Sequence, residues 1–370
     1  MVLSKRTFLI SLTLMCLATV LLGYWWEWRT WVMLAYEHKA PAWFQSLIQT
    51  VYPRFGVEKQ RFPLDFFLKK ADQVMLRLAL VSSIGLLFFW LRQTKPAIRQ
   101  KISHYWDATT SRRNIGLQLQ FFAGLMLLFT WDWYFYLKNL EQARAFYAPI
   151  LLYRLLHLPF PTPDWLLCFW ILFWLANLAL LAKFKVFWSS FISVFFFVLL
   201  QGYMHCFHKL DHTYATLTYV ALLIPLMAWY YPKSSRQSSQ TLVSWPWRLA
   251  QIMIALVYLQ AAVEKLLIGG FTWLYPQNFR AYLYMHPTTL GEWLSQSDFW
   301  CIALPLGALL FQIAFVSIVF FPRFKWFFLL AGLVFHLSTF LLLGIGWYYS
   351  PWMLVYLFLI DWTPKNQQNV

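Results

Sequence analysis

The chain of 370 residues is 61% hydrophobic and 21% aromatic, with 12% charged residues, and its mean hydropathy is +0.53. This composition excludes an ordinary soluble domain, in which about 45–50% of residues are apolar and about 25% are charged. The net charge of +16 could suggest nucleic-acid binding. Lys and Arg instead gather in alternate short loops between apolar runs, the distribution of a membrane protein, so no nucleic acid is expected as a partner.

The apolar runs predict membrane-spanning helices. Only helices and closed barrels pair all their backbone polar groups inside a bilayer, and these runs are about 17–22 residues long without the alternation of a barrel strand. We therefore predict an all-α fold, a polytopic integral membrane helical bundle of about ten transmembrane helices. The expected spans lie near 7–26, 74–91, 116–136, 164–182, 186–203, 214–231, 247–267, 301–321, 326–345 and 348–361.

The basic loops also predict the orientation in the lipid bilayer. They are best matched with a cytoplasmic N-terminus, and ten spans then place both termini inside. A nine-span arrangement, with the C-terminal tail outside, stays open because the tail carries only Lys365. Lys5-Arg6 before the first apolar run favours an uncleaved signal anchor over a cleaved signal peptide. The short loops favour a multi-pass protein of the bacterial inner membrane, and a protein of the endoplasmic reticulum would show much the same pattern.

Three parts are expected along the chain. Residues 1–111 form an N-terminal section with two transmembrane helices and an amphipathic outer loop, which is rich in aromatic side chains between positions 25 and 44. Residues 112–362 form a transmembrane helical domain of closely spaced spans. Residues 363–370 form a polar C-terminal tail.

Lys265 is the most informative residue, because it lies near the end of the long apolar run that begins at Trp247. Gln251, Tyr258 and Lys265 are seven residues apart and share one helix face. An ionisable group in hydrocarbon costs about 3 kcal/mol or more, so it faces protein, water or a ligand. A lysine that only extends to the membrane surface is the plain alternative.

A metal site is weakly indicated and not expected. His205, His208 and His212 have the spacing of ligands on one helix face, but the eight histidines of the chain form no further cluster. Interfacial loop histidines explain this spacing better. Cys206 and Cys301 both fall on the predicted outer side, where a disulfide is geometrically possible, although two unrelated thiols are favoured.

Three motifs resemble, in order and spacing, the HTTM domain, the membrane domain of vitamin K-dependent gamma-glutamyl carboxylases and their bacterial relatives. The stretch from Gln251 through Tyr258, Glu264 and Lys265 to Trp273 is similar to the lysine-containing helix of that domain. Asp211-His212 is similar to a motif that opens another helix. Phe335-His336, followed by Gly344-Ile-Gly346, is similar to a late helix that ends in an Ile-Gly turn. The resemblance covers about residues 112–362.

This resemblance implies a catalytic set of Lys265, His212 and His336. In the carboxylases, the lysine that matches Lys265 deprotonates a reduced quinone of the vitamin K or menaquinone hydroquinone type, and the histidine that matches His212 assists the later carboxylation. The implied pocket residues are Tyr258, Glu264, Asp211, Trp273 and Gln251. No metal is expected.

Two functions remain open at this point. The first is a quinone-using enzyme, carboxylase-like, with a lysine base at the outer membrane face. The second is a non-enzymatic partner subunit, transporter or carrier in which the same polar residues form a buried network that holds the helices together. The first requires Lys265, His212 and His336 to line one cavity, whereas the second requires these side chains to pair tightly.

Overall fold

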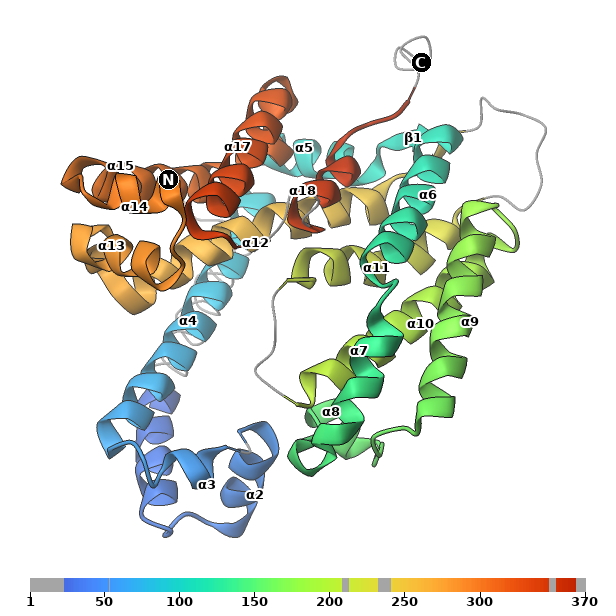
Figure 1. The fold of residues 1–370 in the computed structure, drawn as a ribbon. Helices are drawn as coiled ribbons and strands as arrows, with labels where there is room; N and C mark the ends of the chain where they lie inside the picture. The colour runs from blue at the N-terminus through green and yellow to red at the C-terminus, as the bar shows by residue number, and fades with distance from the viewer. Residues whose placement is uncertain (1–22, 53, 208–212, 232–240, 346–350, 364–370) are drawn as a thin grey trace. The chain divides into compact units, whose positions relative to one another are not determined.

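The computed structural model describes residues 23–52, 54–207, 213–231, 241–345 and 351–363 (Figure 1). It divides into two compact units, Met1–Tyr105 and Trp106–Val370. The described residues are almost entirely helical. Their two short strands, β1 (Thr109–Ser111) and β2 (Thr241–Val243), form one antiparallel pair in which Thr110 lies opposite Leu242.

The first unit consists of short helices that share one aromatic core with the first turns of a long helix. Its helices are 23–36, α2 (Ala42–Val51), α3 (Phe55–Glu58), α4 (Leu64–Thr94) and most of α5 (Pro96–Asp107). Pro63 precedes α4, Asp65 lies in its first turn and Arg92 in its last, as the helix dipole favours. Phe44 of α2 and Phe67 of α4 are buried in one aromatic core, in which the ring of Phe44 contacts Trp28 and Trp31 of the helix 23–36.

The second unit is a bundle of longer and shorter helices. Its α-helices are α6 (Arg112–Phe129), α7 (Trp133–Leu140), α8 (Leu151–Leu155), α9 (Pro163–Leu181), α10 (Val186–His205), α11 (Ala215–Trp229), α12 (Trp245–Gly269), α13 (Pro276–Met285), α14 (Thr289–Ser295), α15 (Asp298–Ala314), α16 (Ser317–Phe320), α17 (Lys325–Leu343) and α18 (Pro351–Leu354). Short 3₁₀ segments are η1 (Glu141–Phe146), η2 (Gly270–Leu274), η3 (Pro322–Phe324) and η4 (Val355–Leu359). In Figure 1, α9 and α10 lie side by side, and α12 packs against both α11 and α15.

Six of the described helices are long and apolar enough to cross a membrane, which indicates a multi-pass, all-α membrane protein. They are Leu64–Thr94, Pro163–Leu181, Val186–His205, Trp245–Leu274, Asp298–Phe320 and Pro322–Leu343. The pair Arg112–Phe129 and Trp133–Phe146, bent by 47°, would add a seventh span.

The predicted count of ten spans is therefore not confirmed. Nearly all of the expected span 7–26 lies outside the described residues, as does part of 348–361. The described part of the last span is broken into α18 and η4, and α11 has only 15 residues. Each is too short to cross about 30 Å of hydrocarbon as one straight helix.

The core of the second unit is built from aromatic rings that several helices contribute. The ring of Trp133 stacks on Phe197 at 5.5 Å between centroids and on Phe173 at 6.5 Å, which joins α7, α10 and α9. Buried amides fasten the C-terminal segment to α6. The Oδ1 of Asn114 accepts from the backbone N–H of Trp362 at 2.9 Å, and Gln118 donates to the carbonyl of Ile360 at 3.0 Å.

The ring of Tyr153 lies so close to Gly202 on α10 that only glycine fits there. We therefore predict that any larger residue at this position lowers the stability of the fold. A Cβ at Gly202 would overlap the Tyr153 ring, which is buried and whose hydroxyl donates to the carbonyl of Leu199. We expect Gly202→Ala to destabilise the protein by about 1–3 kcal/mol, because the ring must move in a packed site. The measurement is the thermal unfolding midpoint in detergent.

The matched control is Gly124→Ala on α6, where an added Cβ would have no neighbour within 4 Å. Alanine is the better helix former, so this variant should unfold at the wild-type temperature or slightly above it. Equal midpoints for the two variants would contradict the predicted overlap.

Candidate functional site

Lys265 lies one turn before the end of α12, where Gly270 adopts a positive φ of 54° and the helix stops. Its Nζ donates to the side-chain oxygen of Gln312 on α15 at 3.0 Å and to the carbonyl of Ala261 at 3.3 Å. It also lies 5.5 Å from the ring centroid of Trp273, within the range of a cation–π contact. The ammonium group is therefore held inside the unit by protein groups.

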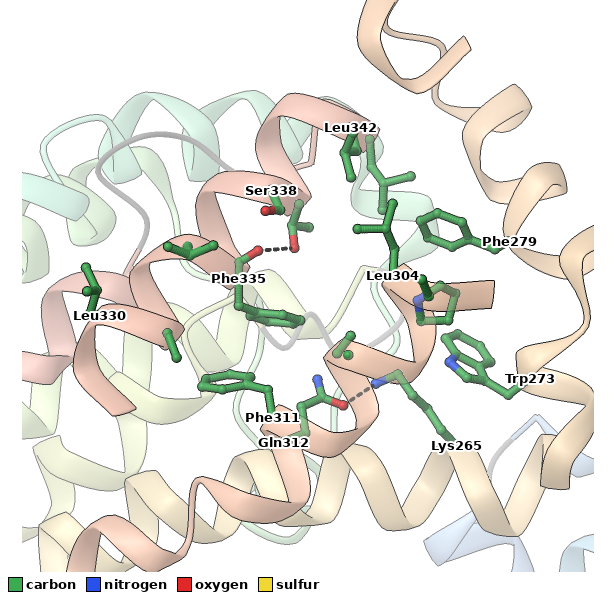
Figure 2. Close-up of a pocket in the computed structure, with 18 of the residues that line it drawn as sticks. Lys265, Trp273, Phe279, Leu304, Phe311, Gln312, Leu330, Phe335, Ser338 and Leu342 are labelled. Atoms are coloured by element: carbon green, nitrogen blue, oxygen red, sulfur yellow. Dashed lines mark hydrogen bonds between the residues drawn. The ribbon is translucent and has the colours of Figure 1, made fainter. Parts of the chain in front are cut away.

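A cavity of about 570 Å³ opens beside this lysine, between α12, η2, α13, α15 and α17 (Figure 2). That volume falls within the usual range of small-molecule sites, about 300–1,000 Å³. Apolar and small side chains form most of the wall. The lining residues are Lys265, Trp273, Phe279, Ala303, Leu304, Pro305, Gly307, Ala308, Phe311, Gln312, Phe327, Leu330, Ala331, Val334, Phe335, Ser338, Thr339, Leu342 and Leu343.

The polar side chains of this wall are few and come from three helices. Lys265 on α12 and Gln312 on α15 meet at one place, whereas Ser338 and Thr339 belong to α17. The hydroxyl of Thr339 donates to the carbonyl of Phe335 at 2.9 Å, so its hydrogen is already used. An apolar cavity with one hydrogen-bonded cation suits a ligand that is mostly hydrocarbon and carries an oxygen acceptor.

His336 does not line this cavity, although Phe335 next to it does. The Nε2 of His336 lies 2.6 Å from the hydroxyl of Tyr258 on α12, and that hydroxyl lies 2.7 Å from the hydroxyl of Tyr356 in η4. These three residues form a buried polar chain, which we call the Tyr258 network. Phe311 stacks on Phe335 at 5.2 Å, and both rings belong to the cavity wall.

Gln251 has a structural position at the other end of α12. Its amide nitrogen donates to the carbonyls of Phe358 and Leu359 at 3.3 and 3.2 Å, and Trp247 donates to the same Phe358 carbonyl at 2.7 Å. The short 3₁₀ segment η4 leaves these carbonyls without partners of its own. Gln251 therefore satisfies buried backbone groups and does not line the cavity.

The remaining predicted site residues separate into three groups. Trp273 lines the cavity, and Glu264 does not. Asp211 and His212 lie outside the described residues, so the structure does not place them. The sequence placed Tyr258 and Lys265 on one long helix, as they are in α12, and Trp273 in the loop after it, where the structure has the 3₁₀ segment η2. Tyr356 and Ser338 were not identified. Each of these two residues carries a hydroxyl group inside an otherwise apolar run, and this feature could have identified them.

The alternatives left open for metal and disulfide chemistry can be compared with the structure. Within the described ranges, no group of three or more His, Cys, Asp or Glu side chains could hold a metal ion. His208 and His212 lie outside those ranges. Cys206 and Cys301 are both buried free thiols and are not bonded to each other.

The chain has no match among the comparisons with known proteins: no protein-family model fits it, and neither a curated protein nor a solved structure is detectably similar. Its function must therefore be argued from the residues themselves.

The Tyr258 network predicts a loss of stability on removal of one oxygen atom. Tyr258→Phe would leave His336 and Tyr356 without this partner in a buried site, at a cost of about 1–3 kcal/mol. Tyr219→Phe on α11 is the control, because the Tyr219 hydroxyl makes no hydrogen bond to the described residues. A lower unfolding midpoint for Tyr258→Phe alone confirms the network, and equal midpoints contradict it.

Proposed function

We propose that this chain is an integral membrane protein that binds a lipid-soluble ligand of the quinone type in the Lys265 cavity. The observation that carries the proposal is the meeting of Lys265 Nζ with the Gln312 side chain in the wall of an apolar cavity of about 570 Å³. Lipid-soluble rings with oxygen substituents match this combination, because the ring needs apolar walls and the oxygen needs a donor.

The residues present fit such a ring. Phe311, Phe335 and Trp273 supply aromatic faces, and ring pairs of this kind contribute about 0.5–1.5 kcal/mol beyond the buried area. Ala303, Gly307 and Ala308 on α15 leave space along the wall. Lys265 would hold a ligand oxygen by donating a hydrogen bond from Nζ, and Gln312 would keep that nitrogen in place.

The resemblance to the HTTM domain extends the proposal to chemistry. A bound hydroquinone supplies a hydroxyl proton, and Lys265 in its neutral form would accept that proton at Nζ. The hydrogen bond from Nζ to Gln312 would orient the amine for this transfer. Carboxylase-like activity with Lys265 as its base is the enzymatic form of the proposal.

The second candidate is a non-enzymatic partner subunit or carrier. The observation that favours it is the Tyr258 network, in which His336 pairs tightly and does not face the cavity. Gln251 likewise pairs with backbone carbonyls. A carrier could still hold a ligand at Lys265, so this candidate differs from the first in turnover and not in binding.

Lys265→Met predicts weaker ligand binding. The substitution keeps an unbranched side chain against the wall but removes the charged donor, and a hydrogen bond to a charged group contributes about 1.5–3 kcal/mol. We expect the Kd for reduced and oxidised menaquinone to rise at least about tenfold in purified protein in detergent, because about 1.4 kcal/mol corresponds to tenfold.

Lys138→Met is the control for this change. Lys138 also lies near an aromatic ring, Tyr134 at 5.9 Å, but it does not line the cavity. Its Kd should equal the wild-type value. Saturable binding that survives Lys265→Met unchanged, or no binding by folded wild-type protein, would overturn the quinone proposal.

We predict that a substitution that fills the cavity weakens ligand binding but does not lower the stability of the folded protein. A Cβ at Gly307 would meet no atom within 4 Å, so Gly307→Leu can extend into the open space beside Phe311. We expect reduced menaquinone binding and an unfolding midpoint no lower than that of the wild type. Gly124→Leu, on the open side of α6, should retain binding, and equal binding by both variants would contradict the assignment.

A further inference from the structure

The first unit carries an apolar helix stripe that the described residues of this unit leave exposed. Trp43, Leu47 and Val51 follow one another at intervals of four residues on α2, and their exposed fractions are 59%, 39% and 64%. Residues four apart in a helix lie on one face. Phe44, in contrast, is 1% exposed on the packed side of the same helix.

The orientation of α2 is fixed by contacts at its buried face and at its C-terminal end. Phe44 packs in the core with Phe67 of α4. Tyr52, which follows α2, donates to Glu58 and accepts from Lys70 of α4. The hydrogen bond from Tyr52 lowers the pKa of Glu58 and so favours the carboxylate that pairs with Lys70. The exposed stripe therefore has a defined direction relative to α4.

The apolar part of α4 begins close to this cluster. Between Arg77 and Arg92 the helix carries no charged residue, and large side chains such as Val81 and Ile84 are 71% and 65% exposed. Ala71, the last α4 residue of the aromatic core, precedes Leu78 by about 10 Å at 1.5 Å per residue. The membrane surface, where the apolar part of α4 begins, therefore lies within about 10–12 Å of the aromatic core that contains Phe44 and Phe67. This distance is about the diameter of one helix.

We propose that the stripe Trp43–Leu47–Val51 inserts into the headgroup region of the same membrane that α4 crosses. The lipid surface is favoured over a protein partner by two features. α2 contains no charged residue, and its largest exposed side chain is a tryptophan, which is enriched at membrane–water interfaces. The cluster then acts as an interfacial anchor that fixes the depth of α4. This inference is independent of the function proposed for the Lys265 cavity.

The test uses the full chain in phosphatidylcholine vesicles with a fluorescent label on one introduced cysteine. Cys16→Ser and Cys168→Ser form the background, because Cys206 and Cys301 are buried. Leu47→Cys places the label in the stripe. Gln49→Cys is the matched control, since Gln49 is exposed on the same helix about 160° away, at 100° per residue.

Quenching by a phospholipid with a nitroxide high on its acyl chain and quenching by aqueous iodide are compared. We expect the lipid quencher to act at least about twofold more strongly at position 47 than at position 49, and iodide to show the opposite order. Equal access of iodide to both labels would overturn the proposal. Protection of the Leu47→Cys label from both quenchers would also overturn it, because another protein segment or a second copy would then cover the stripe.

Discussion

An ammonium group among apolar helices must be hydrogen-bonded, and this constraint organises the second unit around Lys265. In hydrocarbon an unpartnered charge costs several kcal/mol, so the sequence can keep a lysine there only with partners in place. Gln312 from α15 and the carbonyl of Ala261 supply these partners, and Trp273 lies against the same charge. These contacts hold α12, α15 and η2 around the Lys265 ammonium group, and the cavity opens beside it.

The polar residues of α12 serve two different purposes. Near one end, Gln251 satisfies the carbonyls of η4, and in the middle Tyr258 joins His336 and Tyr356. These pairs replace water for buried groups and stabilise the packing. Near the other end, Lys265 has a similar need for partners but faces open space as well. The structural and ligand-binding interpretations therefore apply to different parts of one helix, about two turns apart, and they do not compete for the same residues.

Many helices could be predicted from the length and apolarity of the sequence runs, whereas the partners of the polar side chains could not. Uninterrupted apolar runs correctly predicted α9, α10 and α17, because a helix that must satisfy its own backbone in lipid needs only length and apolarity. The last run, near 348–361, was predicted as a short span that could be re-entrant or tilted differently. In the structure α18 continues directly into the 3₁₀ segment η4, and the carbonyls of Phe358 and Leu359 at its end accept hydrogen bonds from Trp247 and Gln251 of α12.

The seven-residue spacing of Gln251, Tyr258 and Lys265 predicted one shared face, but it could not predict which helix meets each turn. Gln251 meets η4, Tyr258 meets both η4 and α17, and Lys265 meets α15, so the three side chains of this face have different sets of partners. The position of His336 outside the cavity could likewise not be predicted, because the sequence does not show which neighbour each side of α17 meets. Phe335 and His336 are consecutive and therefore point about 100° apart on α17.

The most direct test of a lipid-soluble ligand in the Lys265 cavity is photolabelling in native membranes with an azido-substituted quinone, followed by peptide mapping. The account predicts labelled peptides from α12, α15 and α17 around Lys265, Gly307 and Phe335, with labelling competed by unmodified menaquinone. Labelling confined to other helices, or labelling at these peptides that menaquinone does not compete, would contradict the account.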